Sequence, residues 1–383
     1  MKQSWIIAWR QLMMEKRRVA AAVAGITFAV LLMLVQLGFE QALFKSVKLL
    51  YQEFDAELFL VNPRYQNAQF TFAFAQRRLE QSLAADGVER VDPLYMKMLI
   101  WKNPINGLKQ EIFAIAIPPR AGVMTLPEVN EHIAALRTAD TVLFDGWSRD
   151  EYGPVSELLK KGPLRVEIDG MSAPVDSEFH MGTSMATNGN IVLSDESMKD
   201  FMPGYDLRLL TIGLIKLKPG ADAVAVQKQL RAMLPDDVAV LTREELMDRE
   251  ATYWATHTPI GFVFRMGLIM GLIVGSVVVY QILYNDVTQH LNEYATLKAI
   301  GYPDRFLFQI VWQESFILSL LGFIPGLVFS QAVYSIAHWA TLLPLQIDPV
   351  RVAVVYALTV GMCIFSGALA TRRLRNADPA EIF

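Results

Sequence analysis

Four long apolar stretches constrain the fold of this 383-residue chain more than any other feature. A helix needs about 20 mostly apolar residues to cross a bilayer core of about 30 Å. The stretches that reach this length are Val19–Gly38, Met266–Tyr284, Phe306–Phe329 and Val352–Ala370. Charged residues make up 19% of the chain, below the average of about 25% in soluble domains. The sequence therefore predicts an integral membrane protein with four spans.

The first stretch has one alternative reading, because a basic segment precedes it as in a secretory signal peptide. Its apolar run is too long for such a peptide, and the following Gly38-Phe39-Glu40-Gln41 has no small-residue cleavage site. We therefore expect a span. Trp5 and Trp9 share a helical face ahead of it and predict an interfacial amphipathic helix, the alternative being a loose tail.

Basic residues flank the first and last spans and predict that both termini are cytoplasmic, because lysine and arginine concentrate in cytoplasmic segments. Five precede the first span and three follow the fourth, whereas Ser335–Pro349 has none. The segment Glu40–Thr258 then lies outside the cytoplasm, with a net charge of −8 against +4 for the rest of the chain.

The predicted fold class is an α+β membrane protein with a large mixed α/β domain between the first two of four transmembrane helices. Residues 1–18 form a cytoplasmic helix, 40–258 the external domain with stalk helices, and 285–305 a cytoplasmic coupling region. The four spans are placed at 19–39, 259–284, 306–333 and 351–370. A short external loop (334–350) and a cytoplasmic tail (371–383) complete the chain.

The external domain shows both helical and strand patterns. Glu40–Tyr51 continues the pattern of the first span, and Thr242 with Glu245 predicts a capped helix leading to the second. These two helices are the expected stalks. Further helices are predicted at Phe74–Ala85 and Ala221–Leu234, and strands at Leu94–Trp101, Glu111–Ile117, Leu164–Ile168, Asn190–Leu193 and Leu210–Leu217.

Motifs for nucleotide, metal or nucleic-acid binding are missing. The chain has no G-x-x-x-x-G-K-[ST], its five histidines are scattered, and its net charge is −4. Its single cysteine, Cys363, excludes an internal disulfide. Gly182-Thr-Ser-Met-Ala186 matches the serine motif of subtilisin-like proteases, but the family's histidine motif is absent. We interpret it as a loop, and predict no catalytic residue, metal or cofactor in this chain.

Glycines recur at four-residue spacing in the second span, at Gly267, Gly271 and Gly275. Such a face lets two helix backbones approach closely. It predicts either a homodimer seam, which we favour, or packing against another span of the same chain. Gly322 and Gly326, with Pro325, indicate a second close contact or a kink in the third span.

Three polar residues within the spans are candidate functional residues: Gln36, Gln313 and Glu314. A carboxyl group in a membrane is costly and is a functional hypothesis by default. Glu314 either acts in the working cycle of the protein or has a structural partner or headgroup nearby.

The turn between the second and third spans contains a short amphipathic helix that Gly301 ends in a left-handed conformation. Its shape suits docking in the groove of a partner, the alternative being a purely structural interfacial helix. The candidate contact residues are Glu293, Tyr294, Thr296, Leu297, Lys298 and Gly301.

This segment, Glu293-Tyr-Ala-Thr-Leu-Lys-Ala-Ile-Gly301, and the four-span layout resemble the MacB/FtsX class of ABC-transporter permeases. Within this class, the chain more closely resembles the DevC-type permeases. The runs that carry this resemblance are Gly25-Ile-Thr-Phe28, Gln36-Leu-Gly-Phe39, Thr258-Pro-Ile-Gly-Phe262, Tyr280-Gln-Ile-Leu-Tyr284, Gly322-Phe-Ile-Pro-Gly326 and Ala377-Asp-Pro-Ala-Glu-Ile-Phe383.

The resemblance implies a homodimeric permease of the bacterial inner membrane that works with a separate ATPase subunit, which would bind ATP and Mg²⁺. It also implies a periplasmic membrane-fusion adaptor and, indirectly, a TolC-like outer-membrane channel. ATP-driven motion would reach the periplasmic domain by mechanotransmission and drive efflux of a lipid or amphiphile such as a glycolipid. The alternatives are an FtsX-like regulator of a cell-wall hydrolase and a membrane-anchored enzyme, which the missing catalytic constellation disfavours.

Overall fold

A computed structural model describes residues 16–184, 187–290, 296, 300–341, 343 and 345–375 of the chain. This part of the chain divides into two compact units. The helical unit contains the long helices up to Ala42 and after Thr258, and the α/β unit contains Leu43–Thr258. The amphipathic helix predicted from Trp5 and Trp9, and residues 376–383 of the predicted tail, lie outside the described residues.

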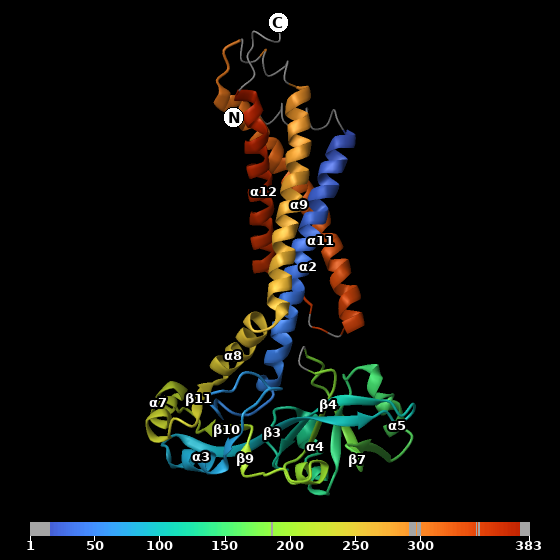
Figure 1. Cartoon of the computed structure of the whole chain (residues 1–383), viewed down its shortest axis with the longest axis vertical. Coiled ribbons are helices and arrows are strands. Elements are labelled where there is room, and N and C mark those ends of the chain that lie inside the picture. Colours follow the sequence, from blue (N-terminus) through green and yellow to red (C-terminus); the bar gives the residue numbers. More distant parts are fainter. Residues whose placement is uncertain are drawn as a thin grey trace. The chain divides into compact units, whose positions relative to one another are not determined.

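The helical unit is built from four helices, each long and apolar enough to cross a membrane. They are α2 (Lys16–Gln52), α9 (Pro259–Gln289), α11 (Asp304–Thr341) and α12 (Pro349–Arg375), and they contain the four predicted spans. Their buried side chains form one apolar core, and α9 packs along α12 (Figure 1). Helix α11 continues to Thr341, so the first half of the loop predicted at 334–350 is helical.

Eleven strands are found in the described part of the α/β unit. They are β1 (Leu58–Val61), β2 (Phe74–Ala75), β3 (Val88–Lys102), β4 (Lys109–Ile117), β5 (Val142–Asp145), β6 (Leu164–Ile168), β7 (Met171–Phe179), β8 (Asn190–Ser194), β9 (Leu209–Leu210), β10 (Ile212–Leu217) and β11 (Ala239–Thr242).

Nine of these strands form one sheet in the order β11-β1-β10-β3-β4-β8-β5-β7-β6, and β2 pairs with β9. β3 also pairs with β6, so that β3, β4, β8, β5, β7 and β6 close into a ring. Val88–Leu94 of β3 pairs with β10, and Tyr95–Lys102 pairs with β4. β3 is therefore common to the ring and to the four-stranded end of the sheet.

Short helices cover the sheet (Figure 1). Helices α3 and α7 lie at the four-stranded end, and α4 and α5 lie beside β7 of the ring. The helices of this unit are α3 (Gln76–Gln81), α4 (Pro127–Glu131), α5 (Val155–Leu159), α6 (Met198–Phe201), α7 (Ala223–Met233) and α8 (Arg243–Thr256), with 3₁₀ turns η1 (Ser82–Ala84), η2 (Ala135–Arg137) and η3 (Asp150–Tyr152).

Both faces of the sheet are buried, in two separate apolar cores. Along β1, Leu58 and Leu60 enter one core, while Phe59 and Val61 enter the other, because successive side chains of a strand point to opposite faces. The first core receives side chains from α3 and α7, and the second receives them from α8 and the last turns of α2.

The expected stalk helices are present as elements. α2 is one continuous helix from Lys16 to Gln52, and α8 begins with the predicted capping box. Thr242 Oγ1 accepts a hydrogen bond from the Glu245 amide at 3.2 Å, and Glu245 Oε2 accepts one from the Thr242 amide at 2.9 Å. α8 ends at Thr256, before α9 begins at Pro259.

One predicted helix begins later than expected. Phe74 and Ala75 were included in a helix over Phe74–Ala85, but they form β2, and α3 starts only at Gln76. The reason is tertiary, because these two residues pair with Leu209–Leu210 far along the chain. Local periodicity carries no information about such a partner.

Candidate coupling and transmission sites

The turn predicted to contact an ATPase is described only at its end. Thr296 accepts a helical hydrogen bond at its carbonyl oxygen from the Ile300 amide, at 3.0 Å. Gly301 has a φ of 101°, the left-handed conformation predicted for the residue that ends this helix. Ile300 is 71% exposed, an apolar side chain at the surface of the helical unit. The other predicted contact residues lie outside the described part of the chain: Glu293, Tyr294, Leu297 and Lys298.

The glycine face of α9 packs against α2 of the same chain. A Cβ atom placed on Gly271 would lie 3.2 Å from Cγ of Met33, and one on Gly275 would lie 2.8 Å from Cβ of Ala29. Gly267 likewise contacts α2. The face therefore packs against α2 within one chain, which is the second of the two alternatives that the sequence predicts. The homodimer seam stays a prediction.

α11 makes a second close contact with α2, as Gly322 and Gly326 predict. A Cβ atom on Gly322 would lie 2.5 Å from Cβ of Ile26, and one on Gly326 would lie 2.7 Å from Cβ of Val30. Thr27 Oγ1 donates a hydrogen bond to the Gly322 carbonyl oxygen at 3.1 Å. Helix α2 is thus held between α9 and α11 by contacts that only glycine permits.

The three polar residues predicted inside the spans do not meet in one site. The Gln36 side chain lies against Gly267 of α9. Gln313 and Glu314 lie on α11, where Gln313 is partly buried and Glu314 is only 1% exposed. Neither carboxyl oxygen of Glu314 has a hydrogen-bond partner among the described residues.

A buried carboxyl group, Glu250 of α8, joins the last turn of α2 to the α/β unit. Glu250 Oε2 accepts hydrogen bonds from the Tyr51 hydroxyl at 2.6 Å and from the Ala68 amide at 3.0 Å. Glu250 Oε1 accepts one from Trp254 Nε1 at 3.0 Å, and the Tyr51 and Tyr65 hydroxyls are 2.5 Å apart. These contacts fix α2, α8 and the loop after β1 to one another.

Burial raises the pKa of Glu250 to about 7, although each hydrogen bond to the carboxylate lowers it. Desolvation penalises the ionised carboxyl more than these donors stabilise it. The same burial, with the nearby Glu250 charge, raises the pKa of Tyr51 and of Tyr65. Both phenols therefore stay protonated at neutral pH, and the Tyr51 hydroxyl donates to Glu250.

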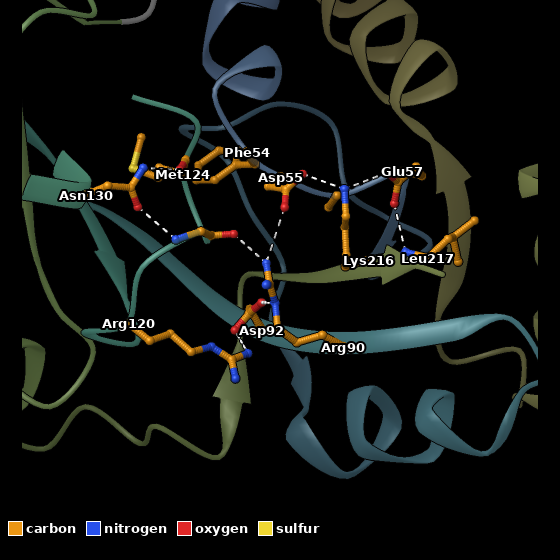
Figure 2. A network of polar contacts seen from close by, with 12 residues as sticks. Phe54, Asp55, Glu57, Arg90, Asp92, Arg120, Met124, Asn130, Lys216 and Leu217 are labelled. Carbon is orange, nitrogen blue, oxygen red and sulfur yellow. Dashed lines mark hydrogen bonds and ion pairs between the residues drawn. The ribbon is translucent and has the colours of Figure 1, made fainter. Parts of the chain in front are cut away.

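A network of charged groups connects the segment that follows α2 to β10 (Figure 2). Lys216 Nζ on β10 binds Asp55 Oδ1 at 2.6 Å and Glu57 Oε1 at 2.9 Å. Glu57 Oε2 accepts a hydrogen bond from the Leu217 amide at 2.8 Å. Figure 2 also shows Phe54 beside Met124, with which it forms an isolated β-bridge. The segment after α2 therefore contacts two segments that are distant in the sequence, β10 and the loop that contains Met124.

The same network continues to β3 and the loop after β4 (Figure 2). Asp92 is 2% exposed and pairs with Arg120 and with Arg90, whose Nε lies 2.7 Å from Asp92 Oδ2. Arg90 Nη2 donates to the Gly122 carbonyl oxygen at 2.5 Å and lies 3.7 Å from Asp55 Oδ2. Two arginines thus compensate one buried carboxylate and connect it to the segment after α2.

The described residues of the serine motif, Gly182, Thr183 and Ser184, lie in a loop, as interpreted from the sequence. Ser184 Oγ accepts a hydrogen bond from the Thr187 amide at 3.2 Å. His180 pairs instead with Glu128, its Nδ1 lying 3.2 Å from Glu128 Oε1. Asp145 organises the loop by accepting hydrogen bonds from the Gly182 amide and other donors. The described contacts of Ser184 therefore differ from those of a catalytic triad.

The sequence analysis did not identify the residues that contact Glu250, nor those of the network around Lys216 and Asp55. Glu250 and Tyr51 are separated by 199 positions, and Lys216 and Asp55 by 161. Each appears in the sequence as an ordinary charged or aromatic residue of a helix or strand. Only the capping box at Thr242 gave a local signal, and it placed the start of α8.

Comparison with known proteins locates the helical unit in a family. Residues 265–379 match the family model described as FtsX-like permease C-terminal, a segment that includes most of α9, all of α11 and α12, and the predicted coupling turn. No curated protein sequence matches the chain.

Solved structures similar to part of the chain include domains of MacB and of YknZ. The periplasmic region of MacB from Actinobacillus actinomycetemcomitans is 9% identical, with a TM-score of 0.36, over 51% of this chain and 92% of that one. The extracellular domain of the noncanonic ABC-type transporter YknZ from Gram-positive bacteria is 13% identical, with a TM-score of 0.34, over 49% of this chain and 99% of that one. At these values neither likeness assigns a function.

The family match and the four long helices agree with the resemblance seen in the sequence. The described helices α2, α9, α11 and α12 make the chain a multi-pass membrane protein. Residues 265–379 of this protein match an FtsX-like permease C-terminal domain.

Proposed function

We propose that this chain is the permease subunit of an ABC exporter and passes motion from a separate ATPase subunit to its α/β unit through α2. The ATPase, which would bind ATP and Mg²⁺, docks on the turn that ends at Gly301. The working form is a homodimer in the inner membrane, with the α/β unit in the periplasm. An adaptor and a TolC-like channel complete the path for a lipid or amphiphile, such as a glycolipid.

The observation that carries this proposal is the continuity of α2 from Lys16 to Gln52 and the way its last turns are fastened. A continuous helix transmits displacement along its axis because every backbone hydrogen bond lies within it. At its end, Tyr51 bonds Glu250, and Asp55 pairs with Lys216. A displaced α2 would therefore act on α8 and on the sheet through these contacts.

An insertion in α2 tests this mechanism. Three glycines inserted between Ala42 and Leu43 should break the helix. The hydrogen bond of Tyr51 and the ion pair of Asp55 should stay intact. The full chain is reconstituted in liposomes with its ATPase, and both ATP hydrolysis and cargo release are measured. We expect hydrolysis to continue and cargo release to be lost.

The same insertion between Lys161 and Gly162, in an exposed turn after α5, is the matched control and should leave release unchanged. Full release with the α2 insertion would contradict transmission through α2.

The cargo and the partners are tested by co-purification. We expect the chain to bring down an ATPase and an adaptor with a long coiled coil, and mass spectrometry to find an enriched lipid. A cell-wall hydrolase in place of the adaptor would contradict export and favour the FtsX-like regulator.

A further inference from the structure

Glu314 is buried in the helical unit without compensation from the described residues. Its side chain is 1% exposed, and neither carboxyl oxygen has a hydrogen-bond partner in the described part of the chain. An ionised carboxylate in this position would lose its hydration without gaining donors. Such burial is costly for a charged group, and a bound proton removes this cost.

Glu314 lies on the face of α11 that is buried in the helical unit. Val311 and Ile317, three residues before and after it, belong to the apolar core that α9 and α12 share. At the next residue, Ser315, the helices pack closely: a Cβ atom on Gly367 of α12 would lie 3.5 Å from Leu283 of α9 and 3.5 Å from Val311 of α11.

Among the described residues, the charged group that acts on Glu314 is Asp286 of α9, which has the same sign. Arg18 Nη1 of α2 lies 3.8 Å from Asp286 Oδ1, and His290 Nδ1 of α9 lies 3.6 Å from the same oxygen, so both of these side chains contact Asp286. On the inward face of α12, the titratable group one turn before Gly367 is the buried Cys363.

We propose that Glu314 is a proton-binding site of the helical unit. It carries a proton while α9, α11 and α12 are packed together, and it releases this proton to water when the three helices separate. The O–H bond of the carboxyl group breaks, and the carboxylate formed is hydrated in the opened unit. By linkage, a bound proton stabilises the packed arrangement and a rise in pH favours the open one. The proposal rests on this packing and is independent of the proposed function.

Infrared spectroscopy of the purified full chain in lipid nanodiscs tests the site directly. A protonated carboxyl group gives a carbonyl band that is separate from the carboxylate bands and shifts in D₂O. The Glu250→Gln protein is used as the parent, because Glu250 titrates near neutral pH. At about pH 8, where an ordinary carboxyl group is fully ionised, we expect the band to remain in this parent. It should be lost when Glu314→Gln is added.

The labelling rate of Cys363, the single cysteine of the chain, is a second measurement and reports separation of α12 from its neighbours. We expect the ratio of wild-type to Glu314→Gln rates to rise with pH, because only the wild type gains a charge that favours opening. Comparing the two proteins cancels the pH dependence of the thiol reagent. Glu250→Gln, in the other unit, should not change the ratio.

Two results would overturn the proposal. The first is the lack of a D₂O-sensitive band in the parent protein at about pH 8, which would show that Glu314 is ionised and paired. The second is a Cys363 labelling ratio that stays constant with pH. The first result needs no substitution at Glu314, so it decides the question even where Glu314→Gln does not fold.

Discussion

Glu250 shows how one carboxyl group can define a joint between a long helix and a domain. It receives hydrogen bonds from α2, from α8 itself and from the loop after β1, and its own side chain is buried. Its position could not be predicted, since Tyr51 and Ala68 lie 199 and 182 positions away. Burial and pairing arise only when the chain has folded, and a single sequence does not record them.

The raised pKa of Glu250 predicts a pH-dependent stability. The folded chain, with a pKa of about 7 against 4.5 in the unfolded chain, binds more protons between these values. The free energy of unfolding therefore falls as pH rises through this window, by about 3 kcal/mol in total. We expect Glu250→Gln to remove this slope in thermal unfolding of the full chain. An unchanged slope in the variant would assign the effect to another group.

At the scale of elements, the sequence predicted the long helices well because their apolar runs are themselves the signal. The sequence analysis did not predict β1 or β5, because these strands lack such a signal. All four residues of each strand are buried, so Leu58–Val61 and Val142–Asp145 lack the polar–apolar alternation of a half-exposed strand. The glycine motif correctly predicted close helix packing, but the identity of the partner helix depends on the tertiary fold.

Gly322→Ala should destabilise the helical unit, because the new Cβ atom would lie 2.5 Å from Cβ of Ile26 and push α2 from α11. Overpacking of this kind costs about 1–3 kcal/mol. Thermal unfolding in nanodiscs measures the change. Gly361→Ala on α12 is the control, since no atom lies within 4 Å of its Cβ position. Equal melting temperatures for the two variants would show that α2 and α11 do not pack closely here.

The coupling turn is tested by reversing two charges together, Glu293→Lys and Lys298→Glu. If these side chains contact the ATPase, we expect ATP hydrolysis to persist and its coupling to export to be lost, with folding unchanged. Hydrolysis and transport are measured in the same liposomes. Normal coupling with normal ATPase binding would mean that the partner docks elsewhere.

For the whole molecule, the basic residues around the first and last spans predict which side of the membrane each segment occupies. In a Cys363→Ser background, Lys161→Cys in the α/β unit should react with a membrane-impermeant thiol reagent in spheroplasts, whose outer membrane has been removed. Gln289→Cys, at the end of α9, should react only after lysis. Labelling of both positions in intact spheroplasts would contradict the predicted orientation.

β3 has a consequence for how the α/β unit loses its structure. Its fifteen residues complete the hydrogen bonds of β10 over one half and of β4 over the other. If the β10 side or the β4 side of the sheet opens, backbone groups of β3 lose their hydrogen bonds. Because β3 belongs to both sides, neither side unfolds as a separate cooperative unit. Hydrogen–deuterium exchange should find the amides of Val91 and Met98 among the slowest, with similar protection, because both exchange only through global unfolding of this unit.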